Sequence, residues 1–254
     1  MKGLIAYFDV LGFSNLIRED KFSEKRKTYT QILDNAVKQN RNLDYIVFSD
    51  SVIIKSETIN EKELLNLCKA ISEISYELLF KLELPIRGCI SCGEFTWDVE
   101  EGNSIISGIP ILDAISWEKK QNWIGVILSP YVVDKFRDLY EKTNFESIYD
   151  DESFKIFESN IDWKVHIQIY NEIPLSSREY YEGFVVLPRN PESSNLELIF
   201  DLRNYRDKLR FMTLLAPDPS VQSKYAYSSN MLANIWVACE HRYDDYKQYK
   251  ISIY

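Results

Sequence analysis

The 254-residue sequence is short of cysteine, of histidine and of long hydrophobic runs, and each shortage excludes a class of protein. The cysteine pair at 89 and 92 forms a lone CxxC on an expected strand, where the two side chains point to opposite faces. We interpret both as ordinary strand positions rather than as a metal or redox site. No apolar stretch approaches the ~20 residues that span a membrane, and the N-terminus lacks a signal-peptide pattern. We therefore expect a cytoplasmic protein with no membrane partner.

Positive charge is also scarce. Lysine and arginine total 30 against 39 aspartates and glutamates, which gives a net charge of −9 and a pI of about 5.0. A protein that binds nucleic acid non-specifically needs a basic surface, so we expect no nucleic-acid partner. A nucleotide substrate stays compatible with this charge, because its pocket needs only a metal ion and one or two cations. The hydrophobic content of 45% is enough for a globular core.

Two aspartates each end an apolar run that is typical of a strand. Asp9 follows the run 4–8, and Asp50 follows the run 45–48. If the two strands lie side by side, two carboxylates meet at one edge of a sheet, and they repel each other unless a cation lies between them. Hard divalent ions prefer oxygen ligands, and paired metal ions bind phosphates. The two aspartates therefore predict a metal site.

Two further features suit phosphate, and each has a structural alternative. Gly12 lies between the first strand and a short helix, and such a corner offers free backbone N–H groups. The same glycine can equally make an ordinary tight turn. Arg87 lies inside an otherwise apolar strand, where a cation needs a partner. From the residues alone, a salt bridge to a nearby acid and a clamp on a phosphate are equally good explanations.

The hydrophobic pattern predicts an α+β fold with a ferredoxin-like core and helices packed on the sheet. The expected strands are 2–9, 43–49, 51–56, 86–94, 105–106, 123–128, 154–158, 163–170 and 183–187. The expected helices are 13–20, 23–41, 60–84, 108–120, 130–142, 195–215 and 218–241. Residues 97–103 are expected to form a polar loop. The linker-like stretch 188–195 divides a core domain at 1–190 from a C-terminal helical appendage at 191–254, which we expect to dock on the core.

Four segments in order, over about residues 1–130, resemble the class III nucleotide cyclases. They are Phe8–Ser14, Ser49–Ser51, Ile86–Glu94 and Gly108–Glu118 with the following Ile127–Ser129. The resemblance implies an enzyme in which Asp9 and Asp50 bind two Mg²⁺ or Mn²⁺ ions, with the Val10 carbonyl as a further ligand. It implies that Arg87 contacts the triphosphate of the substrate. The backbone amides that would hold its β- and γ-phosphates are those of Leu11, Gly12, Phe13 and Ser14. Members of this family work as homodimers that share each active site between two subunits, and the resemblance implies the same here.

The sequence also departs from the family pattern. The family's fourth helix supplies an asparagine and an arginine, and the corresponding positions here are Leu112 and Ser116. The usual transition-state arginine is therefore missing unless a lysine at 119, 120 or 164 replaces it. The family's purine-selecting lysine and acid are replaced by Ile46 and Ile105.

These departures, the small chain and the C-terminal helix with Lys224 and Tyr225 resemble the pyrimidine cyclases of the bacterial Pycsar systems. That resemblance implies conversion of UTP, or as second choice CTP, to the 3′,5′-cyclic monophosphate and pyrophosphate. It implies a second messenger in anti-phage defence that activates a separate effector protein.

Two alternatives stay open. A degenerate cyclase-like domain would bind a nucleotide or a partner without turnover, and the missing asparagine and arginine favour it. The second alternative is a different metal-dependent phosphoryl-transfer enzyme on a related sheet, such as a diguanylate-type cyclase or a polymerase palm. The sequence has no Gly-Gly-acid-acid-Phe signature to support it.

Overall fold

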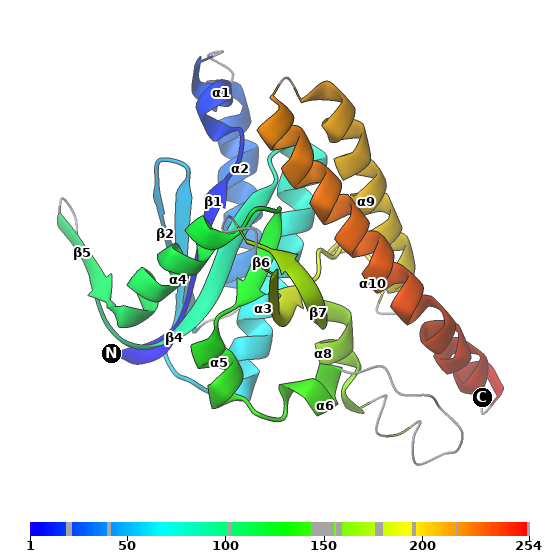
Figure 1. The fold of residues 1–254 in the computed structure, drawn as a ribbon. Helices are drawn as coiled ribbons and strands as arrows, with labels where there is room; N and C mark the ends of the chain where they lie inside the picture. The colour runs from blue at the N-terminus through cyan, green and yellow to red at the C-terminus, as the bar shows by residue number, and fades with distance from the viewer. Residues whose placement is uncertain are drawn as a thin grey trace.

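The computed structural model describes residues 1–18, 22–39, 42–100, 103–143, 155, 159–175, 180–194, 197–216 and 218–252. Its first half contains β1 (Lys2–Val10), α1 (Phe13–Arg18), α2 (Phe22–Lys38), β2 (Leu43–Phe48), β3 (Ser51–Ser56), α3 (Glu61–Glu77), the π-helical turn η1 (Leu78–Leu82), β4 (Ile86–Glu100) and β5 (Asn103–Gly108). Its second half contains α4 (Ile109–Lys120), β6 (Gly125–Leu128), α5 (Pro130–Lys135), α6 (Leu139–Thr143), α8 (Ile161–His166), β7 (Ile167–Pro174), β8 (Tyr180–Val186), α9 (Leu198–Leu215) and α10 (Pro219–Ser252). Figure 1 shows these elements around one twisted sheet.

The sheet has the strand order β2-β3-β1-β4-β6-β8-β7, and β5 pairs with the outer part of β4. In the first four strands of this order every neighbouring pair is antiparallel. The crossover from β1 to β2 passes over β3, and the crossover from β3 to β4 passes over β1. This is the βαββαβ topology of a ferredoxin-like core. The predicted α+β fold with that core is confirmed.

Strand β1 lies inside the sheet, and its side chains alternate between the two faces. Leu4, Ala6 and Phe8 are buried with side chains of α2 and α3. Ile5 is buried on the other face with side chains of α4, and Tyr7 contacts a further cluster on that face. Figure 1 shows α4 in front of the sheet, with α2 and α3 behind it. The odd-numbered residues of β1, and therefore Asp9, belong to the face that α4 covers.

The two C-terminal helices form an antiparallel hairpin beside the sheet (Figure 1). Leu202 and Leu209 of α9 and Leu232 and Ile235 of α10 are buried in one cluster with Trp123 from the core. The predicted C-terminal helices are therefore present and docked. The division into residues 1–190 and 191–254 stays a proposal, because this shared cluster joins the two parts. Although α10 has 34 residues, neither it nor any other described helix has a segment apolar enough to span a bilayer.

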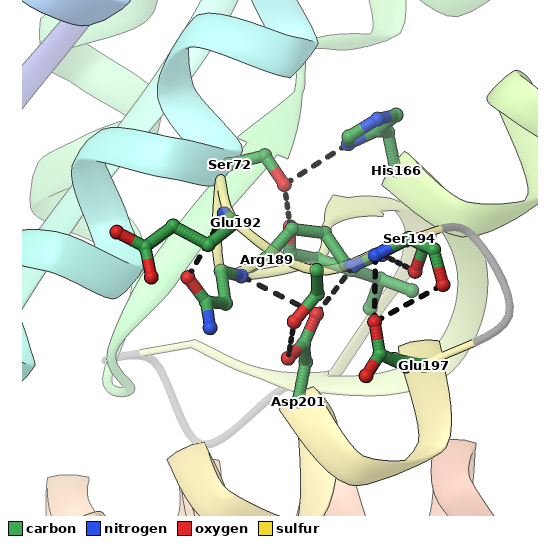
Figure 2. Close-up of polar contacts among 10 residues, drawn as sticks. Ser72, His166, Arg189, Glu192, Ser194, Glu197 and Asp201 are labelled. Atoms are coloured by element: carbon green, nitrogen blue, oxygen red, sulfur yellow. Dashed lines mark hydrogen bonds and ion pairs between the residues drawn. The ribbon is translucent and has the colours of Figure 1, made fainter.

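A buried polar network fixes the start of α9, as Figure 2 shows. Arg189, just after β8, pairs with Asp201 of α9 through Nε and Oδ2 at 2.8 Å. The Arg189 side chain also donates to the Ser194 carbonyl at 2.8 Å, and its backbone N–H donates to the carbonyl of Ser72 in α3. His166 Nδ1 lies 3.1 Å from the Ser72 hydroxyl oxygen. Burial lowers the pKa of His166 to about 3, so this histidine is neutral and has a structural role.

Several element boundaries differ from the predictions. The polar loop expected at 97–103 was wrong, because β4 continues to Glu100 and pairs with β5 from Asn103 onward. This hairpin is half exposed, so its strands tolerate polar residues. The strand expected at 163–170 was partly wrong, since α8 continues to His166 and β7 begins only at Ile167. The helix expected at 130–142 is interrupted after Lys135. The strand expected at 154–158 lies outside the described residues except for 155.

Candidate metal and phosphate site

Asp9 is the penultimate residue of β1 and has a partner on each neighbouring strand. Its register partners are Ser51 on β3 and Arg87 on β4. Directly opposite residues of antiparallel strands share one face of the sheet. The three side chains therefore belong to one face, the one covered by α4, and the pairing of β1 with β3 and β4 is what brings them together.

Two hydroxyl groups fix one oxygen of the Asp9 carboxylate. The Tyr7 hydroxyl donates to Oδ1 at 2.7 Å, and the Ser51 hydroxyl donates to the same oxygen at 2.6 Å. The two hydroxyls also contact each other at 2.9 Å. Burial raises the pKa of Tyr7, and the Asp9 carboxylate raises it further, so the phenol stays a donor. Among the described residues, nothing donates to Oδ2 of Asp9, which is left available for a cation.

Asp50 occupies the turn that joins β2 to β3. The turn consists of Ser49 and Asp50, and Ser49 adopts a left-handed φ of 57°. A serine in this conformation costs of order 1 kcal/mol, which is typical of functional turns. The Val10 N–H donates to the Asp50 carbonyl at 2.7 Å, so the turn is attached to the end of β1. The half-buried Asp50 carboxylate has no hydrogen bond or ion pair within the described part of the chain.

These residues fit a divalent ion of the Mg²⁺ type. Asp9 pairs with Ser51, the residue that follows Asp50, so the two aspartates come from adjoining positions at one end of the sheet, and the Val10 carbonyl is close by in sequence. Oxygen donors of this kind suit hard cations that keep several water or phosphate ligands. The described residues contain no group of three or more histidine, cysteine, aspartate or glutamate side chains placed to hold a metal ion. A metal ion at Asp9 and Asp50 therefore needs further ligands from water or substrate.

The corner after β1 is partly committed to the fold. The Leu11 N–H donates to the Pro85 carbonyl at 2.8 Å, so this amide is not free for a phosphate. Gly12 has a left-handed φ of 84°, which a glycine adopts without strain. Helix α1 begins at Phe13, whose side chain is buried, and continues through Ser14. Phosphate binding by the amides of residues 12–14 stays a prediction.

Arg87 is bound to an acid on α4. Its Nε donates to Glu118 Oε1 at 2.6 Å, its Nη2 contacts the same oxygen, and its Nη1 donates to the Gln121 carbonyl at 3.2 Å. The Glu118 side chain is 1% exposed and that of Arg87 15%. Burial raises the pKa of Glu118, while Arg87 lowers it. This contact is the salt bridge of the structural alternative, and it joins the end of α4 to β4 next to Asp9.

Close packing of β1 against β4 explains why the residue after Arg87 is a glycine. A Cβ atom at Gly88 would lie 2.3 Å from the Tyr7 carbonyl oxygen and 2.4 Å from the Phe8 Cβ. The Gly88 carbonyl in turn accepts a hydrogen bond of 2.9 Å from the Gln121 side chain. Gly88 therefore allows β1 and β4 to approach closely at the site.

The two positions expected to select the base lie on different strands. Ile46 is half-buried in β2 opposite Ile53. Ile105 is 51% exposed on β5, opposite Asp98 near the outer end of β4. Within one chain the structure does not bring Ile105 to Asp9.

The replaced fourth-helix positions are exposed, with Leu112 at 69% and Ser116 also at the surface of α4. Of the candidate replacement cations, Lys120 lies over the Trp117 ring at 4.5 Å. Lys119 is exposed on the same helix. Lys164 is buried in α8, on the α3 side of the sheet.

Sequence reasoning gave no role in the site to four of its residues. Tyr7 and Ser51 hold Asp9, Glu118 binds Arg87, and Lys224 of α10 is close enough for its charge to interact with that pair. Tyr7 and Ser51 were detectable, because each is one or two positions from an aspartate on an alternating strand. The partner of Arg87 could not be predicted from the sequence, since many other acidic residues of the chain could have paired with it.

No protein-family model matches the sequence, and a search of curated proteins finds no relative. Solved structures with a similar course of the chain include a guanylyl cyclase domain of the RhoGC fusion protein from the aquatic fungus Blastocladiella emersonii. It is 12% identical, with 75% of this chain and 98% of that chain covered and a TM-score of 0.47. An adenylate cyclase from Trypanosoma brucei is 12% identical over 76% of this chain and 92% of that chain, with a TM-score of 0.48. The adenylyl cyclase CyaB from P. aeruginosa is 13% identical over 76% of this chain and 97% of that chain, with a TM-score of 0.44. Similarity at this level decides neither family nor activity.

Proposed function

We propose that the chain is a metal-dependent nucleotide cyclase, which converts a nucleoside triphosphate to its 3′,5′-cyclic monophosphate and pyrophosphate. The proposal rests on one observation above all. The pairing of β1 with β3 places Asp9 beside the turn that carries Asp50, and both carboxylates keep oxygens without a protein partner. The four segments that resemble class III cyclases support it independently.

In this proposal the two aspartates and the Val10 carbonyl bind two Mg²⁺ or Mn²⁺ ions. When bound, such ions lower the pKa of the ribose 3′-hydroxyl and offset the charge of the leaving pyrophosphate. Tyr7 and Ser51 hold one oxygen of Asp9, so that the other points to the cation. Residues Gly12 to Ser14 bind the outer phosphates through backbone N–H groups. Arg87 would reach the triphosphate only if it exchanged part of its contact with Glu118.

We further propose a pyrimidine substrate, with UTP favoured over CTP. The support is the replacement of the family's purine-selecting lysine and acid by Ile46 and Ile105. The cyclic pyrimidine nucleotide would then be a second messenger in anti-phage defence that activates a separate effector. The test is to extract nucleotides from phage-infected cells that contain the protein. A cyclic UMP or CMP signal that rises on infection supports this role, and no rise in either refutes it.

The resemblance also leads us to propose a homodimer with shared sites. Large apolar side chains lie exposed at the end of β2 and on α4, where Phe48 is 80% and Leu112 69% exposed. Exposed apolar groups of this kind are common where another chain binds. Light scattering after gel filtration should give twice the chain mass for the wild type. A charge at Phe48 or Leu112 should shift it toward the monomer, and a wild-type monomer at working concentration would contradict the proposal.

A degenerate nucleotide-binding domain is the second candidate, and two observations favour it. Arg87 is held by Glu118, and the exposed Leu112 and Ser116 cannot donate as asparagine and arginine do. Such a domain would bind a triphosphate and release no product.

One incubation separates the two candidates. Purified protein with Mn²⁺ is given ATP, GTP, CTP or UTP, and the products are identified by mass spectrometry. A cyclic pyrimidine monophosphate supports the cyclase and names the base. A cyclic purine product retains the cyclase and refutes the pyrimidine assignment. Binding of a triphosphate without any product supports the degenerate domain.

A further inference from the structure

A pocket of about 430 Å³ lies between the corner after β1 and the corner that joins α9 to α10. Leu11 and Gly12, which follow Asp9 closely in the sequence, line one side. Residues of the C-terminal hairpin line the other side, among them Met212, Val221, Lys224 and Tyr225. Figure 1 shows the beginning of α10 beside α1 and the end of β1. The C-terminal hairpin therefore closes a cavity directly next to the proposed site.

The charges around this pocket leave one cation without a partner. Glu83 pairs with Lys208 at 2.8 Å, and Asp218 accepts the Ser220 N–H at 2.6 Å at the start of α10. Glu83 thus has a cation of its own, and a backbone N–H binds one oxygen of Asp218. Lys224, half-buried in the wall, has no ion pair or side-chain hydrogen bond with any described residue.

The surroundings of Lys224 favour an incoming anion. Burial lowers the pKa of Lys224, and the nearby Arg87 guanidinium lowers it further, although the charges of Glu118 and Asp218 act in the opposite direction. An ammonium group that is partly removed from water beside another cation gains from a negative ligand. Phosphoryl oxygens provide such a ligand, and lysine binds them as a point charge.

We propose that this pocket receives the polyphosphate chain of the nucleoside triphosphate and that Lys224 contacts its phosphoryl oxygens. The assignment rests on the proposed function, and it gives the C-terminal hairpin a direct part in substrate binding. In this assignment the C-terminal hairpin supplies a cation from outside the core, and this cation faces the corner of residues 11–14.

Calorimetric titration of the full-length protein with inorganic tripolyphosphate in the presence of Mn²⁺ tests the assignment, because this probe has no base or ribose. In the Lys224→Met variant we expect the dissociation constant to rise roughly tenfold to a hundredfold, as for the loss of a hydrogen bond to a charged group. Lys224→Arg should stay within a few-fold of the wild type. Arg210→Met removes an exposed positive charge from the same hairpin and should leave the constant unchanged. Thermal unfolding of each variant checks that the fold is retained.

Equal affinity of Lys224→Met and wild type for tripolyphosphate would overturn the assignment, even if the wild type makes a cyclic product. An equal loss in Arg210→Met would overturn it as well, because the effect would then be one of overall charge. A wild type that does not bind tripolyphosphate overturns the subsite, and its product assay with the four nucleotides decides separately whether the cyclase proposal fails too.

Discussion

Replacing Tyr7 by phenylalanine removes one hydroxyl group beside the Asp9 carboxylate and leaves the ring in place. The wild-type hydroxyl donates to Asp9 Oδ1 at 2.7 Å and contacts the Ser51 hydroxyl at 2.9 Å. In the variant, Ser51 alone holds Oδ1, so the carboxylate can rotate. If Asp9 binds a metal ion through its other oxygen, that rotation must weaken metal binding.

The expected magnitude follows from the type of bond that is lost. A hydrogen bond to a charged group contributes about 1.5–3 kcal/mol to stability, and Tyr7 is only half-buried, so we expect a loss of about 1–2 kcal/mol in unfolding free energy. Removing a group that orients a metal ligand typically lowers metal affinity ~10–100-fold. One of two such donors is lost here, so we expect about a tenfold weaker Mn²⁺ affinity, or about 1.4 kcal/mol.

The assay is a calorimetric Mn²⁺ titration combined with urea unfolding, and the chain supplies a matched control. The Tyr45 hydroxyl donates to Asp34 Oδ1 at 3.0 Å, which is the same kind of bond on the opposite face of the sheet from Asp9. Tyr45→Phe should lose a similar free energy of unfolding and keep its Mn²⁺ affinity. If Tyr7→Phe and Tyr45→Phe have the same Mn²⁺ affinity, the reasoning about Asp9 is refuted.

Three further predictions concern the fold around the site. Gly88→Ala should lower the unfolding free energy by about 1–3 kcal/mol or more, because its Cβ would lie 2.3 Å from the Tyr7 carbonyl oxygen; a loss below about 0.5 kcal/mol in urea unfolding would contradict that close approach. Burial raises the pKa of Glu118, so the folded state keeps this proton where the unfolded state has lost it, and stability falls as the pH rises from the ordinary glutamate pKa through the raised one. The stability of the Glu118→Gln variant should not fall in this pH range, and parallel curves of unfolding free energy against pH for variant and wild type would contradict this assignment to Glu118. Arg189→Met should cost about 3–5 kcal/mol by leaving Asp201 buried without its cation; the double variant with Asp201→Leu should recover most of that loss, and equal instability of the two would count against the pair.

The order of elements and the ferredoxin-like core could be predicted from the sequence, because β1, β3 and β4 have long apolar runs separated by clear turn and cap residues. Asn60, at the start of the expected helix 60–84, caps α3, and its side chain accepts the Glu63 N–H at 2.9 Å. The positions of Asp9 near the end of β1 and of Asp50 in the turn after β2 followed from the same patterns, since each aspartate ends a strand-like run.

The remainder depends on contacts that local patterns do not contain. Residues 97–103 of the β4–β5 hairpin were interpreted as a loop, because strands with an exposed face have no strong apolar alternation. The start of β7 was misplaced because residues 163–166 have a strand-like pattern but belong to α8, which packs against α3, where Lys69 pairs with Asp162 at 2.7 Å. Nothing local predicts that Glu118 binds Arg87, or that Lys224, at the other end of the chain, lies near both.

The most direct test of the central claim is the rate of cyclic-nucleotide formation in four variants with Mn²⁺: Asp9→Asn, Asp50→Asn, the double variant and Asp44→Asn. Residues that act as one unit have non-additive effects, so each single variant should lose nearly all product formation and the double variant should be no worse. Asp44→Asn changes an exposed carboxylate of β2 that accepts the Tyr45 N–H, and it should match the wild type. Product formation that survives in either single variant, or that falls in the double variant by the product of the two single effects, would contradict a shared metal site at Asp9 and Asp50.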